Sequence, residues 1–286
     1  MGSQSLPRSI FVEPVPQRYR ERVREACLQV LNRCDDLLAI VLIGSVAEGD
    51  FVPESDVDLL CVKEEKLPWE EQREIKEQLD EQVQLIFFDR KTLAFHFQHR
   101  TTMAHAVLRG KILYEVENYI GERRSDTLGL PDRGWMKNWF LHWLKLYGFA
   151  IGGVDRSEGW HRKYCDRTRH DHTDDTLARV AVNFCILFLE IQGLVPTTKS
   201  QILRHFRDTV DDQALIEGLE LALVVSRQER WMTYEEGKTV AQVAAWLRGQ
   251  LIGHLKPTAE DLKEMEQIEA VLHRREAMNE GAVEKR

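Results

Sequence analysis

Residues 43–59 read IGSVAEGDFVPESDVDL and connect two short apolar runs. The first run, residues 37–43, is LLAIVLI, and the second, residues 57–62, is VDLLCV. Both runs are rich in branched side chains and short for helices, so we expect two buried strands. Asp56 and Asp58 are two residues apart at the start of the second strand. Their carboxylates should therefore point to the same face of a sheet.

Two carboxylates held this close repel each other, and a bound cation would relieve the repulsion. Mg²⁺ prefers one or two carboxylates together with phosphate oxygens, so the pair predicts a site for Mg²⁺ or Mn²⁺. Gly44 allows the backbone to approach a ligand closely, and Ser45 opens a short helix whose N–H groups and hydroxyl favour phosphate. A Gly-Ser pair after a strand, or two solvated acids in a turn, is common in proteins and by itself does not indicate a functional site. Together, in this order, they predict phosphoryl or nucleotidyl transfer.

This pattern resembles the DNA polymerase beta-like nucleotidyltransferase superfamily. The matching residues are Ile43, Gly44 and Ser45, then ten intervening residues, then Asp56, Val57, Asp58 and Leu59. The sequence of residues 44–60, GSVAEGDFVPESDVDLL, is similar to that of the minimal and the antibiotic nucleotidyltransferases. Residues 109–115 are similar to the segment that closes the minimal domain, so the resemblance extends over residues 20–116.

The resemblance implies transfer of a nucleoside monophosphate from a nucleoside triphosphate, ATP in the first instance, to an acceptor hydroxyl. Asp56 and Asp58 would be the catalytic residues and would hold two Mg²⁺ ions, one orienting the triphosphate and one activating the acceptor. Gly44 and Ser45 would bind the outer phosphates. The acceptor would be a small molecule such as an aminoglycoside, or a protein.

Gln84 departs from the family pattern, which has a third carboxylate on the following strand. Here that strand is VQLIFF, residues 83–88, and Gln84 is the candidate for the third position. An amide can ligate a metal through its oxygen, but it is uncharged and cannot act as a general base. Three explanations remain open. The enzyme works with two carboxylates and a weaker second metal; Glu81 or Asp89 supplies a carboxylate; or the domain is a catalytically weak or inactive regulatory or toxin–antitoxin-type module.

The order of elements predicts an α+β chain, in which a small mixed-sheet nucleotidyltransferase domain precedes an all-α helical bundle. Helices are expected over residues 17–33, 68–82 and 91–109, and a last short strand over residues 111–114. The bundle resembles HEPN domains or the helical domains of kanamycin nucleotidyltransferases. We expect an irregular lead-in, a nucleotidyltransferase domain, a linker and a helical-bundle domain over residues 1–16, 17–120, 121–134 and 135–286.

The charge of the chain bears on whether it binds nucleic acid. The formal net charge is -8, which argues against nucleic acid, although residues 160–172 form a basic segment. Within it, Arg162, Lys163, Arg167 and Arg169 are candidate contacts to the acceptor or to phosphates, and an exposed charged loop is the competing interpretation.

The five cysteines lack CxxC spacing and are expected as small buried hydrophobes. With no signal peptide or membrane span, we expect a cytoplasmic protein. A homodimer remains open.

Overall fold

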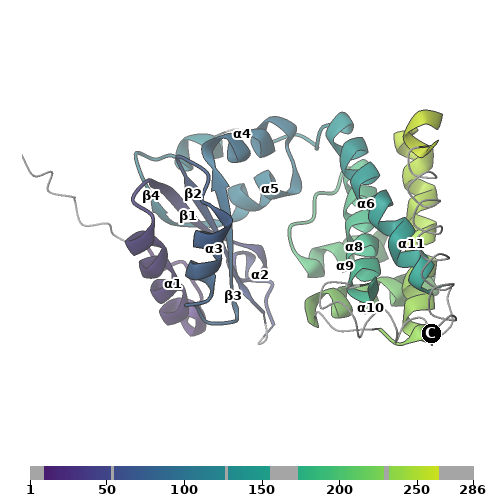
Figure 1. The fold of residues 1–286 in the computed structure, drawn as a ribbon, viewed down its shortest axis with the longest axis horizontal. Helices are drawn as coiled ribbons and strands as arrows, with labels where there is room; N and C mark the ends of the chain where they lie inside the picture. Colours follow the sequence, from purple (N-terminus) through teal and green to yellow (C-terminus); the bar gives the residue numbers. More distant parts are fainter. Residues whose placement is uncertain (1–9, 53–54, 126–127, 155–172, 229–231, 264–286) are drawn as a thin grey trace, which may run out of the picture. The chain divides into compact units, whose positions relative to one another are not determined.

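The computed structural model describes residues 10–52, 55–125, 128–154, 173–228 and 232–263 (Figure 1). The chain divides into two compact units, residues 1–131 and 132–286. The first unit contains all the strands of the described residues, and the second is built from helices. This architecture confirms the predicted α+β class, with a mixed sheet followed by a helical domain.

Four strands form one sheet in the order β3-β2-β1-β4. Their bounds are β1 (Leu37–Ile43), β2 (Val57–Lys63), β3 (Val83–Asp89) and β4 (Lys111–Glu115). β1 pairs antiparallel with both β2 and β4, whereas β2 pairs parallel with β3. The parallel pair needs a crossover, which contains the helix α3 (Trp69–Lys76).

Helices cover both faces of the sheet (Figure 1). α1 (Arg20–Arg33) and α3 bury one face, in a core that includes Leu59 and Cys61 of β2. α4 (Arg90–His99) and α5 (Thr102–Arg109) bury the other face, in a core that includes Leu60 and Val62. Because side chains alternate along a strand, Asp58 belongs to the same face as Leu60.

Three of the expected helices differ from prediction. The first begins as a 3-10 turn, η1 (Gln17–Tyr19), before α1. α3 ends at Lys76, and a turn at Asp80, whose carboxylate accepts the Gln82 N–H at 2.8 Å, follows before β3. The single helix expected over residues 91–109 is wrong. Arg100 adopts a left-handed conformation with φ of 53°, and α5 then starts anew behind Thr101, whose hydroxyl accepts the Ala104 N–H.

The segments on either side of this unit's main elements are also ordered. Val12 and Val15 of the lead-in are buried in the core that holds α1, and the Phe11 N–H donates to the Leu113 carbonyl at 2.8 Å. After β4 a 3-10 turn, η2 (Gly121–Ser125), follows.

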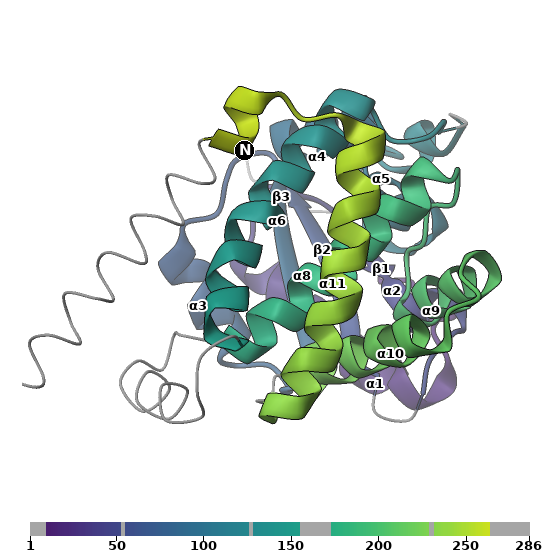
Figure 2. The same cartoon turned by 90° about the vertical axis from the view of Figure 1, so that its right-hand side faces the viewer.

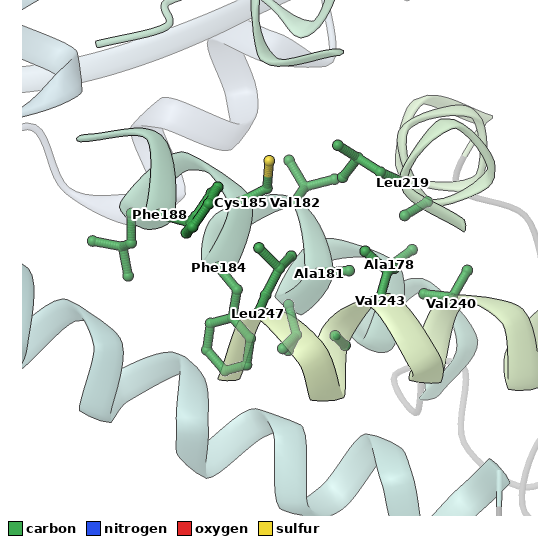
Figure 3. Close-up of a cluster of buried hydrophobic side chains, with 14 of the residues drawn as sticks. Ala178, Ala181, Val182, Phe184, Cys185, Phe188, Leu219, Val240, Val243 and Leu247 are labelled. Carbon is green, nitrogen blue, oxygen red and sulfur yellow. The ribbon is translucent and has the colours of Figure 1, made fainter. Parts of the chain in front are cut away.

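The helical unit has α8 (Thr173–Ile191) at its centre. α6 (Arg133–Val154) and α11 (Tyr234–Leu255) pack against α8 and against each other (Figure 2), and α9 (Lys199–Thr209) and α10 (Gln213–Gln228) complete it. Phe184, Cys185 and Phe188 of α8 form its apolar core with Leu219 and Leu247 (Figure 3). Residues 259–263 are helical. Among the helices that the structure describes, none combines the length and the apolar character that a bilayer crossing requires.

Candidate active site

The polypeptide makes two tight turns between β1 and β2. Gly44 has a φ of 71°, and the short helix α2 (Gly44–Glu48) ends at Gly49, whose φ is 77°. Both values lie in the left-handed region, where a side chain is costly. Ser55 is buried, and its hydroxyl accepts the Val52 N–H at 2.9 Å. Asp56 follows Ser55 and lies directly before β2.

The acid pair lies at the beginning of β2. Asp58 is in register with Ile43 of β1 on one side and with Gln84 of β3 on the other. Asp56 precedes it by two residues, and both side chains are half-buried. Since alternate residues share a face, both carboxylates are on the side of the sheet that carries α4 and α5.

Gly44 is in close contact with this pair. A Cβ atom added at Gly44 would lie 2.6 Å from Oδ2 of Asp58, which is too close for any real side chain. The positive φ and this contact therefore both favour glycine here, because any other side chain would strain the backbone and displace the Asp58 carboxylate. The neighbouring Ser45 is half-buried, and its backbone oxygen accepts the Asp50 N–H at 2.9 Å.

Gln84 joins the site from β3. Its amide Nε2 donates a hydrogen bond of 3.2 Å to Oδ2 of Asp56. The structure thus brings Gly44, Asp56, Asp58 and Gln84 together from three consecutive strands of the sheet. An amide is the third group beside the acid pair, at the register position of Asp58.

The two other carboxylates considered for the third position, Asp89 and Glu81, differ in their distance from Gln84. Asp89 lies five residues beyond Gln84 on β3, about 16 Å away along an extended strand. It caps α4 by accepting the Thr92 N–H at 2.6 Å, and its hydrogen bonds to Thr92 hold the pKa of the Asp89 carboxyl below its usual value. Glu81 is exposed at the near end of β3, next to Gln82, whose carbonyl accepts the Val57 N–H at 2.8 Å. Asp89 is therefore excluded, and Glu81 remains an alternative.

The donor set at this site suits a hard cation. Two carboxylates are ligands that Mg²⁺ accepts when phosphate oxygens complete its coordination, whereas the Gln84 amide presents its nitrogen to Asp56. Over the described ranges of the chain, no cluster of three or more His, Cys, Asp or Glu side chains could hold a metal ion. The residues present thus fit a cation that arrives with a triphosphate.

Tyr19 was not anticipated from the sequence as a supporting residue. Its side chain is 1% exposed, its hydroxyl donates to the Val52 carbonyl at 3.2 Å, and its ring meets Phe51 edge-on at 5.3 Å. These contacts anchor the loop that precedes Asp56. Helical periodicity indicates a buried Tyr19, but no local pattern indicates that its partner is this loop.

The remaining predicted residues do not enter the site. Arg162, Lys163, Arg167 and Arg169 lie outside the described residues, as does Cys165. Cys27, Cys34, Cys61 and Cys185 are free and buried, as expected for small hydrophobes. Burial raises the pKa of the Cys27 thiol to about 12, so this thiol stays protonated near neutral pH.

Comparison with known proteins agrees with this geometry. Residues 25–119 match the family model described as polymerase beta, nucleotidyltransferase. No curated protein matches the chain.

Two solved structures are weakly similar to this chain. One is spectinomycin adenyltransferase AAD(9) from Enterococcus faecialis, with ATP and spectinomycin, at 15% identity and a TM-score of 0.48, covering 83% of this chain and 99% of that one. The other is a nucleotidyltransferase-like protein from Exiguobacterium sibiricum 255-15, at 14% identity and a TM-score of 0.35, covering 82% and 75%. Likeness at this level says nothing of substrate.

The family model includes β1 to β4 and every residue of the candidate site. The helical unit lies outside the matched residues. Residues 25–119 therefore form a nucleotidyltransferase domain of the polymerase beta family.

Proposed function

We propose that this protein is an Mg²⁺-dependent nucleotidyltransferase that moves a nucleoside monophosphate from ATP, or another nucleoside triphosphate, to an acceptor. The observation that carries the proposal is the acid pair, Asp56 and Asp58, on one face of the sheet with the Gly44 backbone against Asp58. The family match of residues 25–119 supports it.

Each residue of the site has a role that follows from its chemistry. Asp56 and Asp58 bind the cation, which when present neutralises charge on the triphosphate and on the departing pyrophosphate. Gly44, which lacks a side chain, allows phosphate oxygens to approach the backbone N–H groups. The Ser45 hydroxyl donates to an outer phosphate. Together these contacts orient the α-phosphate for attack by the acceptor.

Gln84 limits the rate of this reaction. Its amide cannot accept the proton of an acceptor hydroxyl, whereas a positioned carboxylate base contributes about 10²–10⁴-fold. The hydrogen bond from Gln84 to Asp56 specifically favours a second candidate function. In that case the domain binds nucleotide without appreciable turnover and acts as a regulatory or toxin–antitoxin-type module.

The net charge of the chain favours one class of acceptor. A formal net charge of -8 favours a cationic small molecule, such as an aminoglycoside, over a nucleic acid. A protein hydroxyl remains an alternative acceptor.

Pyrophosphate release tests the proposal. We would supply ATP, CTP, GTP and UTP with Mg²⁺ or Mn²⁺ and a pooled acceptor library to the full chain, its Asp56→Asn and Asp58→Asn variants, and Asp208→Asn. Asp208 is exposed on α9, so its variant loses the same charge outside the site. Release that requires an acceptor and both site aspartates, and that survives in Asp208→Asn, is expected. ATP binding by calorimetry with no release from any nucleotide would favour the regulatory module.

A further inference from the structure

The amide of Gln84 lies where a cation ligand would be expected. Its Nε2 is 3.2 Å from Oδ2 of Asp56, and the nitrogen rather than the oxygen faces the carboxylate because two acceptors would repel. The N–H bond dipole presents partial positive charge to Asp56. A divalent cation placed against the same oxygen would be repelled by these hydrogens, so the amide excludes a cation from the β3 side of Asp56.

The two carboxylates also have different neighbours. Asp58 Oδ2 lies against Gly44, on the β1 side of β2, whereas Asp56 Oδ2 lies against Gln84, on the β3 side. A cation shared by the pair and the phosphates would therefore approach Asp56 from a side that Gln84 does not occupy. A second cation would have to bind on the side that Gln84 occupies.

Charge balance leads to the same result. Two dications about 3.5–4 Å apart repel strongly and need several anionic ligands between and around them. The acid pair supplies two negative charges, and the residues that the structure describes contain no third His, Cys, Asp or Glu grouped with it. The charge of the pair matches one dication, so a second dication would depend on the triphosphate oxygens for its anionic ligands.

We infer that this domain binds a single divalent cation with its nucleotide, and that Gln84 excludes the second for two reasons: its N–H donor faces Asp56, and it supplies no negative charge. The inference rests on the proposed function, because it concerns the same acid pair. Gln84 acts here as a positioning residue, since it acts through Asp56. Replacing its amide with a carboxylate should then create the second cation position.

Counting bound Mn²⁺ tests the inference without any turnover. The probe is Mn²⁺ with an ATP analogue whose α–β bridging oxygen is replaced by methylene, added to the full chain and to the Gln84→Glu and Gln84→Ala variants. Equilibrium dialysis gives the number of ions per nucleotide-loaded chain, and electron paramagnetic resonance detects coupling between neighbouring ions. We expect one ion in the natural protein and in Gln84→Ala, and two coupled ions in Gln84→Glu. Gln84→Ala is the matched control because it removes the amide without adding charge.

Three outcomes would overturn the inference. Two ions in the natural protein would do so while leaving the proposed function standing. A single ion in a folded Gln84→Glu protein, verified by circular dichroism, would show that this amide is not what excludes the second. Absence of both Mn²⁺ and nucleotide from the natural protein would overturn the proposed function together with the inference. If Gln84→Glu does not fold, the count in the natural protein still decides.

Discussion

At the scale of single residues, Gly44 is the most constrained position of the site. It has a left-handed φ of 71°, and its Cα lies so close to Asp58 that a Cβ would be 2.6 Å from the carboxylate oxygen. Gly44→Ala should therefore cost about 1–2 kcal/mol of folding free energy through its backbone conformation. It should also displace Asp58, and misplacing a binding group by about 1 Å lowers turnover roughly 100-fold. Urea unfolding and pyrophosphate release measure the two effects.

Gly49 provides the matched control for this substitution. Its φ of 77° is nearly the same, but nothing lies within 4 Å of the Cβ that alanine would add. Gly49→Ala should lose similar stability and keep its nucleotide binding. Equal losses of activity in the two variants would show that backbone strain in the loop, and not the contact with Asp58, explains the effect.

At the scale of elements, the strands were predictable and the joints between helices were not. The apolar runs at residues 37–43 and 57–62 indicated β1 and β2 because they are rich in branched side chains and too short for typical helices. The break between α4 and α5 depends on the left-handed Arg100, which no periodicity reveals. The spacing of Asp56 and Asp58 predicted a shared face. The hydrogen bond from Gln84 to Asp56 depends on the parallel register of β2 and β3, which is a long-range property.

The joint between α4 and α5 should have its own pH dependence. The His96 ring stacks on Phe88 at 4.7 Å, and its Nδ1 lies 2.8 Å from the Thr101 hydroxyl. Burial, together with the charge of His99, lowers the pKa of His96 to about 4. The unfolded chain, with a histidine pKa of about 6.5, then binds a proton more readily than the folded chain. Stability from this group is full above pH 6.5 and is lost as the pH falls toward 4.

His96→Gln should remove this dependence. Linkage gives a loss of at most about 2 kcal/mol in the natural protein between pH 7 and pH 5. Urea unfolding at both pH values measures it, and the variant should lose correspondingly less on acidification. His254→Gln, at an exposed position of α11, is the control and should behave like the natural protein. Identical pH dependence in the natural protein and in His96→Gln would contradict the assignment.

At the scale of the whole molecule, the chain contains separate apolar cores that belong to different units. Phe184 is 0% exposed in the core of the helical unit, and Leu60 is 0% exposed in the core between the sheet and α4–α5. All residues of the candidate site lie in the first unit. A cavity at Phe184 should therefore weaken packing around α8 without altering the acid pair.

Phe184→Ala and Leu60→Ala form a reciprocal pair that tests this division. The first should cost about 3–5 kcal/mol and the second about 2–5 kcal/mol, because each leaves a cavity in a closely packed core. Hydrogen exchange followed by mass spectrometry should show lost protection over α6, α8 and α11 in Phe184→Ala, and over β1, β2 and α5 in Leu60→Ala. Nucleotide binding should persist in the first variant and weaken in the second. Loss of protection across both units in either variant would mean that the two cores unfold as one cooperative structure, and that the nucleotide site depends on helical packing remote from it in sequence.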